Sequence, residues 1–478
     1  MLCVGLLVQA GFLASVAAAE SVPNFVVIMV DDMGYGDAGC FGGTAFPTPG
    51  VDRIAANGVR LTDFHSNGCV CSPTRAALLT GRYQQRAGVD GVIYAAFGRN
   101  RHHGLQRAEV TFAEMLQGKG REQEGDQARA DTSYMTAAIG KWHLGYEPQY
   151  NPIHQGFDRF VGYVSGNVDF HTHIDGAGVF DWWHQNEKVR EPGYTTHLIT
   201  EHADRFIRDA AAAGRPFCLY VAHEAPHDPY QGPQDAPVRK EGEVKLLYNH
   251  RELAHAKRAY AEMMIEMDRG ILRLLDTLDE LKLAEDTLVM FSSDNGATGP
   301  GSCGPLFGMK GTLWEGGHRV PFVAQWKSRI PAGSVSHQLA STMDILPTML
   351  DVVEGVADPD RPLDGISLLP YLVGQPAEPR TMYWKYGDAL SMRDGSLKLV
   401  VNGGRAKPRA NQPRINWQHP DDDRHQLALF DLSTDLAEQH NLVETRAEQV
   451  AELQTRLQKW AAVVTADATT QPTKASDR

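Results

Sequence analysis

The sequence lacks the excess of positive charge that a nucleic-acid-binding protein usually carries. It has 46 Lys and Arg residues against 59 Asp and Glu residues, a formal net charge of -13. Domains that bind nucleic acid usually present a basic face, so this balance argues against a nucleic-acid partner. A local cluster of positive groups must therefore hold any anionic substrate.

Cysteine is also scarce, with 6 residues in a chain of 478. This number is too small for the dense disulfide framework of a small secreted domain. Cys218 lies within the apolar run "PFCLYVAH", where we expect a buried free thiol. One disulfide is possible among Cys40, Cys69, Cys71 and Cys303, and the sequence does not specify its partners.

Long apolar runs are absent after the N-terminus, and none approaches the roughly 20 residues that a membrane-spanning helix needs. The first 19 residues are apolar and rich in alanine, although no Lys or Arg precedes them. Ala17 and Ala19 fit the A-x-A pattern of a cleavage site before Glu20. We predict a signal peptide at 1–19 and export to the periplasm or the medium; the alternative is a buried first strand.

Four apolar segments each end in polar residues that bind ligands or react. "FVVIMV" (25–30) precedes Asp31 and Asp32, and "TLVMFSS" (287–293) precedes Asp294 and Asn295. "MTAAIG" (135–140) leads to Lys141 and His143, and "FCLYVA" (217–222) leads to His223 and His227. Short apolar runs rich in Val and Ile favour strands buried on both faces, as in a parallel sheet between helices. Ligands bind beyond the carboxyl ends of such strands, so we expect these polar groups to meet.

The four residues Asp31, Asp32, Asp294 and Asn295 offer only oxygen donors. Oxygen ligands suit Ca²⁺ or Mg²⁺ rather than zinc. An acidic pair at one strand end is more often a turn or a helix cap. Two pairs at equivalent strand ends favour a site for a hard cation.

A further group of residues adds positive charge and proton-transfer capacity. Lys141, His143, His227 and Lys310 all lie at or near the predicted strand ends or glycine-rich loops. "CVCSPTRAALLTGR" (69–82) predicts a helix with Pro73 near its first position and Arg75 four residues after Cys71, on the same face. A site of this composition stabilises negative charge, as the transfer of an anionic group requires.

The segment beginning at Cys71, "CSPTRAALLTGR", resembles the signature C-x-P-[ST]-R followed by L-T-G-R of the sulfatase family. In the expected order it is accompanied by "MVDDMGYGD" (29–37), "GKWHLG" (140–145), "APHDP" (225–229), "SSDNG" (292–296) and "GMKGTLWEGGHRVP" (308–321). The resemblance implies an alkaline-phosphatase-like fold, an α/β/α sandwich with a small C-terminal antiparallel sheet and helix.

The resemblance also implies a chemistry for Cys71. In sulfatases an enzyme oxidises this cysteine to formylglycine before folding, and the aldehyde is hydrated to a geminal diol. One hydroxyl attacks the sulfur of the ester and expels the alcohol; loss of the proton from the other then releases sulfate and restores the aldehyde. An activated covalent nucleophile and a cation that orients it cooperate in this scheme.

The roles carried over from the family fall on matching positions of this chain. Asp31, Asp32, Asp294 and Asn295, with the modified Cys71, would bind Ca²⁺ or Mg²⁺. Arg75 and Lys141 would hold the diol, and His143 would accept a proton. His227 and Lys310 would bind the sulfate and protonate the leaving oxygen, with Ser165 nearby. His223 and His318 are expected to be structural.

The chain is expected to divide into a catalytic domain (20–375) and a C-terminal subdomain (376–478). "ALSMRDGSLKLVV" (389–401) predicts two strands joined at Asp394-Gly395, and apolar residues from Val450 to Val464 recur at helical spacing. The polar stretch 120–133 predicts a surface insertion.

The segment 165–183, "SGNVDFHTHIDGAGVFDWW", predicts a substrate loop. Asp and Asn bind sugar hydroxyls, and loops around a catalytic site usually carry specificity. We expect a sulfated carbohydrate as substrate, contacted by Asn167, Asp169, His171 and His173. Trp182 and Trp183 offer ring faces to a sugar or, equally well, pack beneath the loop.

Three rival functions are compatible with parts of this pattern. A phosphodiesterase or phosphonate monoester hydrolase shares the fold and the modified cysteine. An inactive relative would bind glycans without cutting them, although no catalytic position is missing. A thiol hydrolase using Cys71 and His143 leaves the oxygen ligands unexplained.

Overall fold

The structure is a computed structural model that describes residues 22–94, 100–118, 134–244, 253–376, 378–403 and 427–471. The predicted signal peptide and the predicted insertion at 120–133 lie outside these residues. No helix of the described part is long and apolar enough to cross a membrane. Among the described cysteines, Cys40, Cys69, Cys71, Cys218 and Cys303 are all free thiols.

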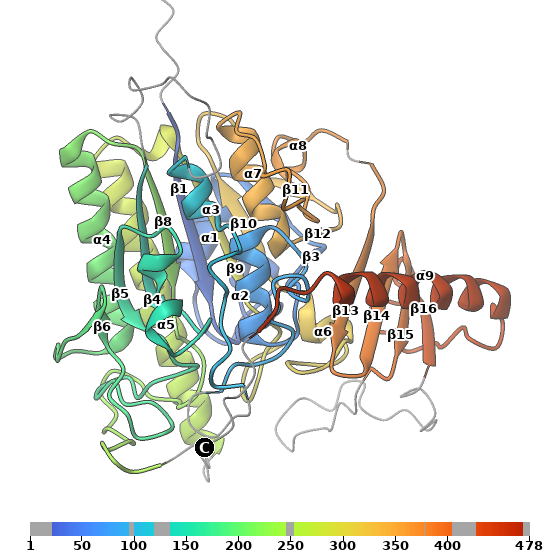
Figure 1. The fold of residues 1–478 in the computed structure, drawn as a ribbon, viewed down its shortest axis with the longest axis horizontal. Coiled ribbons are helices and arrows are strands. Elements are labelled where there is room, and N and C mark those ends of the chain that lie inside the picture. Colours follow the sequence, from blue (N-terminus) through green and yellow to red (C-terminus); the bar gives the residue numbers. More distant parts are fainter. Residues whose placement is uncertain are drawn as a thin grey trace, which may run out of the picture.

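A ten-stranded sheet runs through the larger part of the molecule in the order β11-β2-β10-β9-β1-β8-β4-β5-β6-β7 (Figure 1). Its strands are β1 (Asn24–Val30), β2 (Val59–Leu61), β4 (Met135–Lys141), β5 (Arg159–Tyr163), β6 (Trp183–His184), β7 (Glu187–Lys188), β8 (Phe217–Ala222), β9 (Thr287–Ser293), β10 (Phe322–Gln325) and β11 (Ser334–Ser336). A separate short pair joins β3 (Phe64–His65) to β12 (Ala340–Ser341).

The four strands predicted from their apolar runs are confirmed, and they form the centre of this sheet. β9, β1, β8 and β4 are consecutive neighbours and pair in parallel. Side chains alternate between the two faces of β1: Val26 and Ile28 enter one hydrophobic core, whereas Phe25 and Val27 enter the other. Burial on both faces explains why the sequence is continuously apolar here.

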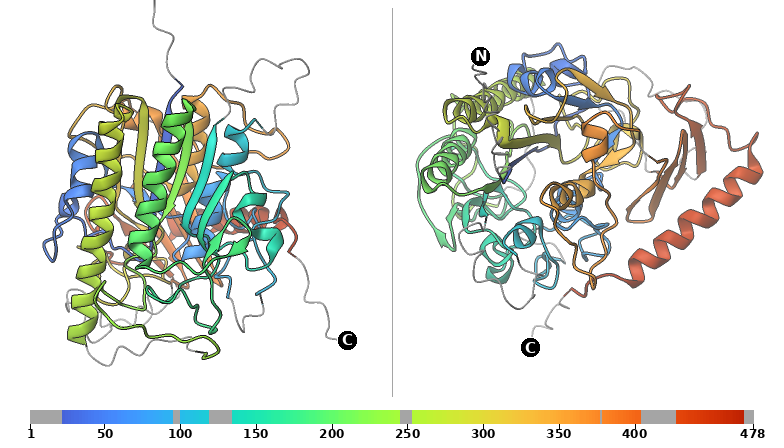
Figure 2. Two further views of the ribbon diagram at one scale, coloured as in Figure 1. Left: turned by 90° about the vertical axis from the view of Figure 1, so that its left-hand side faces the viewer. Right: turned by 90° about the horizontal axis from the view of Figure 1, so that it is seen from above.

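Helices cover both faces of the sheet and make the three layers (Figure 2). One face packs against α1 (Pro49–Ala56), α4 (Thr195–Ala213) and α5 (Leu253–Glu280). The other face packs against α2 (Cys71–Thr80), α3 (Phe112–Leu116), α7 (Ile345–Val352) and α8 (Leu369–Leu372), and short α6 (Glu315–His318) lies toward the C-terminal part. The α/β/α sandwich is therefore confirmed.

The C-terminal part is a four-stranded antiparallel sheet with one long helix beside it (Figures 1 and 2). β13 (Thr381–Tyr386), β14 (Ala389–Asp394), β15 (Leu397–Val401) and β16 (Leu427–Asp431) pair in sequence order. α9 (Ala447–Ala466) buries Val450, Leu453 and Leu457 against one face of this sheet. The strands across the Asp394-Gly395 turn and the final helix are thus confirmed.

A buried group of charges fastens this small sheet to the sandwich. Lys398 on β15 lies 2.9 Å from Glu315 of α6 and 2.8 Å from Glu438, and all three side chains are excluded from solvent. Glu438 also accepts a hydrogen bond of 2.8 Å from the Glu315 amide. Burial and the neighbouring Glu315 raise the pKa of Glu438 to about 7 even though Lys398 lowers it. The ammonium group of Lys398 therefore holds two buried carboxylates together.

We expect Lys398→Met to destabilise the protein because Glu438 loses the ammonium group 2.8 Å away, while Glu315 keeps only Arg319 and Arg393. Loss of one partner from a buried ionic group typically costs about 3–5 kcal/mol. Denaturant unfolding should show this loss at neutral pH. The control Lys459→Met alters an exposed lysine of α9 and should change the unfolding free energy by less than about 0.5 kcal/mol. Equal stability of the two variants would contradict the role assigned to Lys398.

Candidate active site

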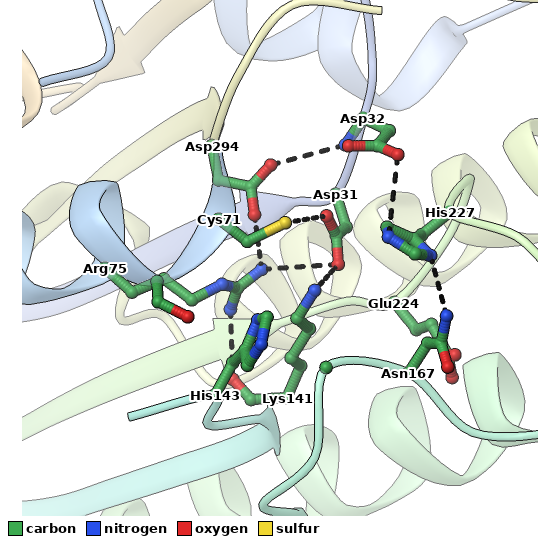
Figure 3. Close-up of polar contacts among 12 residues, drawn as sticks. Asp31, Asp32, Cys71, Arg75, Lys141, His143, Asn167, Glu224, His227 and Asp294 are labelled. Carbon is green, nitrogen blue, oxygen red and sulfur yellow. Dashed lines mark hydrogen bonds and ion pairs between the residues drawn. The ribbon is translucent and has the colours of Figure 1, made fainter. Parts of the chain in front are cut away.

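The oxygen donors predicted at the strand ends meet at the carboxyl edge of the sheet, where Figure 3 shows Asp31, Asp32 and Asp294. Asp31 and Asp32 follow β1, and Asp294 and Asn295 follow the adjacent β9. The Asp32 amide donates to Asp294 Oδ1 over 3.3 Å, and Asn295 Nδ2 donates to Asp32 Oδ1 over 2.7 Å. All four side chains are almost completely buried.

Cys71 is the first residue of α2, and its side chain points into the same group. Its Sγ lies 3.3 Å from Asp31 Oδ1 and 3.3 Å from Lys310 Nζ. Val70 before it is extended, so the chain turns sharply into the helix at this point. The first turn of α2 thereby presents residue 71 to the strand ends.

Arg75 and Lys141 supply positive charge beneath Cys71. Arg75, one turn along α2, lies 2.9 Å from Asp294 Oδ2 and donates to the carbonyl of Lys141 over 3.0 Å. Lys141, at the end of β4, forms an ion pair with Asp31. Burial opposes ionisation of Asp31, but Lys141, His227 and Arg75 hold its pKa well below the ordinary value.

Lys310 and His227 lie on the opposite side, next to Asp32. Lys310 Nζ is 2.5 Å from Asp32 Oδ1, and His227 Nε2 is 3.7 Å from Asp32 Oδ2. His227 Nδ1 lies 2.6 Å from the carbonyl oxygen of Asp228, which orients the ring. The edge of Asp32 that faces Cys71 is therefore bordered by two groups able to donate protons to an anion.

His143 lies beside Lys141 and Arg75 (Figure 3) and is held in a left-handed backbone conformation with φ of 57°. Its Nε2 lies 3.1 Å from the Ile93 carbonyl, while its buried Nδ1 has no hydrogen-bond partner. Burial, Lys141 and Arg75 all lower the pKa of His143 well below the ordinary value. A neutral imidazole with a vacant ring nitrogen is suited to accept a proton.

The residues present fit a hard divalent cation. Donor atoms of Asp31, Asp32, Cys71 and His227 lie within 4.8 Å of one another. Asn295 Oδ1 is buried without a hydrogen-bond partner, so this oxygen is available to bind a cation. Burial and the charge of Asp31 raise the pKa of Asp294 to about 6. The charged form of Asp294 is therefore disfavoured here, and a bound cation would stabilise it.

The surroundings of Cys71 disfavour a thiolate. Burial, Asp294 and Asp31 raise the pKa of its thiol above the ordinary value, although Lys141 and Lys310 oppose the shift. A reactive cysteine instead needs a lowered pKa and partial exposure. The geometry therefore argues against the thiol hydrolase considered above.

Two residues of the predicted substrate loop reach the site. Asn167 Nδ2 lies 3.5 Å from His227 Nδ1 and donates to the Asp228 carbonyl over 3.0 Å. Ser165 is buried close by, and its Oγ donates to the carbonyl of Asn167 over 3.1 Å. Asn167 borders His227, and Gly166, next to Ser165, lies against the His143 ring; substrate contact by Asn167 and Ser165 stays a prediction.

The remaining loop candidates are turned into the protein. The Asp169 carboxylate is fully buried and accepts hydrogen bonds from the amides of Val238 and Arg239 at 2.6 and 3.0 Å. His173 is buried and stacks on Trp182 at 4.7 Å. His171 is half-buried against the Gly232 carbonyl. Because the Asp169 carboxylate is held by backbone amides and the His173 ring is buried against Trp182, we now expect both residues to hold the loop rather than a sugar.

Of the two tryptophans, Trp182 is fully buried and packs as core, whereas Trp183 is partly exposed beneath Lys188. His223 and His318 are both buried. His318 stacks on Trp384 of the C-terminal sheet at 4.3 Å, in agreement with a structural role. His223 has no hydrogen-bond partner on either ring nitrogen.

The sequence interpretation missed Glu224 and Thr298. Glu224 Oε1 accepts from the Val168 amide over 2.7 Å, and burial raises its pKa well above the ordinary value. It thus ties the substrate loop to the turn that carries His227. Thr298 donates to Asp32 Oδ2 over 2.9 Å. The position of Glu224 directly after His223, at the end of a predicted strand, could have identified it. Nothing in the sequence around Thr298 pointed to its contact with Asp32.

Comparison with known proteins agrees with this geometry. The Sulfatase family matches residues 23–356, and the family described as N-sulphoglucosamine sulphohydrolase, C-terminal, matches residues 307–464. The chain is 37% identical to the N-acetylgalactosamine-6-sulfatase of Canis lupus familiaris over 78% of its own length and 70% of that protein. It is 32% identical to human arylsulfatase A over 90% of its length and 85% of that protein.

Among solved structures, that of Ps i-CgsB superimposes with a TM-score of 0.75 at 25% identity, covering 94% of each chain. The match to the family extends over most of the described sandwich and includes every strand end that carries a catalytic candidate. The chain therefore belongs to the sulfatase family, whose activity is the hydrolysis of sulfate esters.

Proposed function

We propose that this sulfatase removes sulfate from carbohydrate esters, using formylglycine made from Cys71 as its nucleophile and Ca²⁺ or Mg²⁺ as its cation. One observation carries the proposal: residue 71 lies between the Asp31 carboxylate and the Lys310 ammonium, each 3.3 Å from Sγ. An oxygen nucleophile bound to a hard cation suits this place, whereas a thiolate does not.

The cation, when bound, would orient the nucleophilic oxygen and increase its acidity. Asp31, Asp32, Asp294 and Asn295 would hold it, and the unpartnered Asn295 Oδ1 supports this assignment. Lys310 would then be available to the anionic substrate and Lys141 to the diol, because Asp32 and Asp31 would be neutralised by the bound cation.

The other residues divide the remaining work by position. Lys310 and His227 flank the side of residue 71 where the sulfate would lie, so they stabilise its charge and supply a proton to the leaving oxygen. His143 is neutral and has a vacant Nδ1, so it serves as the proton acceptor during release of sulfate. Arg75 is held by Asp294 and the Lys141 carbonyl and fixes the floor of the site.

A carbohydrate substrate is supported by what the relatives' names state. The relative at 37% identity is an N-acetylgalactosamine-6-sulfatase. Export, suggested by residues 1–19, would bring the enzyme to extracellular glycans. Maturation of Cys71 further requires a formylglycine-generating or anaerobic modifying enzyme as a partner.

We expect active protein to carry formylglycine at position 71. Peptide mass spectrometry should find an aldehyde there that reacts with hydrazides and resists thiol alkylation. Sulfate release from a sulfated saccharide should track the converted fraction. Full turnover by preparations in which Cys71 is entirely a thiol would refute the mechanism, and turnover of aryl phosphodiesters faster than aryl sulfates would identify a phosphodiesterase instead.

We expect Asp294→Ala to lower kcat more than about 100-fold, because a ligand of the cation and the partner of Arg75 are lost together. Metal analysis of the purified variant by mass spectrometry should show reduced Ca²⁺ or Mg²⁺.

The matched control is Asp360→Ala, which removes an exposed carboxylate from a surface turn and should leave rate and metal content unaltered. Near-normal metal content in both Asp31→Ala and Asp294→Ala would show that the cation binds elsewhere.

A further inference from the structure

Two histidines and a glutamate from separate elements meet at the outer edge of the large sheet. His184 belongs to β6, Glu191 follows β7, and His202 lies in the first half of α4. In the sheet, β6 is four strands away from β1, at the end of the molecule opposite the C-terminal sheet (Figure 1). At a strand spacing of about 4.8 Å, four steps place this cluster roughly 19 Å from the strand that leads to Asp31. The cluster is therefore separate from the catalytic group.

The three side chains bring their ligand atoms together. His184 Nε2 lies 2.9 Å from Glu191 Oε2, and His202 Nε2 lies 3.0 Å from both oxygens of the same carboxylate. All three ligand atoms lie within 4.8 Å of one another. Two ligands of a tetrahedral zinc ion, each about 2.1 Å from the metal, are roughly 3.4 Å apart. Small side-chain shifts would thus admit the ion.

The donor atoms of this cluster differ in kind from those of the catalytic group. Two imidazole nitrogens and a carboxylate oxygen suit zinc, whereas the oxygen donors at the strand ends suit Ca²⁺ or Mg²⁺. His184 and Glu191 keep 35% and 24% of their side-chain surface exposed, which leaves access for an ion and for water as a fourth ligand. The indole of Trp182 donates to Glu191 Oε2 over 3.0 Å. Such an outer hydrogen bond orients a ligating carboxylate.

The pairing of β6 with β7 places a negative charge beside the cluster. Glu187 pairs with His184, so its exposed carboxylate lies on the same side of the hairpin as the His184 ring. Lys188 pairs instead with Trp183 and projects from the opposite side. The hairpin thus turns its carboxylate, and not its ammonium group, toward the proposed ligands.

Two arginines lie near in the sequence and bear on the charge of the cluster. Arg190 forms an ion pair of 2.6 Å with Glu241, which neutralises it. Arg205, one turn beyond His202 on α4, acts against a cation at that ring. Its side chain is exposed, so water and salt screen this repulsion.

The hairpin that carries His184 has little hydrophobic anchorage of its own. β6 and β7 have two residues each; those of β6 are half-buried, and those of β7 are exposed. α4, by contrast, is fixed in the core through residues such as Ile199 and Phe206. A metal bound by both His184 and His202 would connect the loose edge of the sheet to this rigid helix.

We propose that His184, Glu191 and His202 bind one Zn²⁺ ion, with water as its fourth ligand, and that this ion fastens the β6–β7 hairpin to α4. The site is distinct from that of the catalytic cation and takes a different class of metal. Trp182, which donates to Glu191, also stacks on His173 at 4.7 Å, so the ion steadies the base of the predicted substrate loop as well.

Zinc binding should be measured on the untagged, matured enzyme in excess Ca²⁺ and Mg²⁺, which occupy the catalytic group. Competition with a chromogenic zinc chelator should show stoichiometric, high-affinity binding by the wild type. In His184→Gln and in Glu191→Gln the affinity should fall by at least about 100-fold, because loss of a ligand costs more than loss of an outer-shell partner. Zinc should also slow hydrogen exchange of the amides of 183–191 in the wild type, but not in these variants.

The matched control is His197→Gln, which removes a histidine of the same helix that pairs with Glu266 over 3.0 Å. This variant should bind zinc as tightly as the wild type. The exchange measurement on the wild type with and without zinc needs no variant, so it decides the question even if a substitution unfolds the hairpin. Absence of stoichiometric zinc from the wild type, unaltered exchange at 183–191, or wild-type zinc affinity in His184→Gln would each overturn the inference.

Discussion

Electrostatic repulsion among Asp31, Asp32 and Asp294 is the constraint on which the rest of the site depends. Parallel pairing of β1 with β9 brings their carboxyl ends together, and the three carboxylates are buried there without bulk water. Buried charges persist only when they are paired or bind a cation. Lys141, Arg75 and Lys310 neutralise part of this charge. The unpartnered Asn295 Oδ1 lies where a bound cation would neutralise the rest.

The C-terminal sheet contributes no catalytic residue, but it packs against the two segments that carry Cys71 and Lys310. Trp384 of β13 donates to the Ser66 carbonyl over 2.9 Å and packs in one cluster with Cys69, Val70 and Leu313. These contacts hold the segments before Cys71 and after Lys310 against each other. The distance between the nucleophile position and its neighbouring ammonium is therefore fixed by packing across the junction of the two parts.

The sequence predicted the features that depend on strand and helix periodicity. The apolar runs before Asp31, Lys141, His227 and Asp294 gave the central strands, because burial on both faces leaves a continuous apolar signature. Their common edge followed from parallel pairing, so the convergence of the catalytic candidates was predictable as well. The order of the outer strands was not, since short β6 and β7 carry little periodicity.

The sequence pattern could not predict which way the side chains of the irregular loop 165–183 point. Asp169 is a residue type expected to bind sugar hydroxyls. Its carboxylate instead accepts hydrogen bonds from the backbone amides of Val238 and Arg239, about 70 residues later in the chain. Such long-range partners leave no local trace. The role of Glu224 could not be predicted for a related reason, because it consists of a hydrogen bond accepted from the Val168 amide, which is distant in the sequence.

Recognition of sulfate and recognition of sugar therefore have different structural requirements in this chain. The sulfate site is built at the ends of buried strands, where packing and charge fix each group and tolerate little change. The predicted substrate loop 165–183 is irregular chain beside that site, with Asn167 close to His227 and the Asp169 carboxylate held by backbone amides. We therefore expect changes of sugar specificity to arise from substitutions in loops around the site, while the groups at the strand ends and residue 71 keep the chemistry.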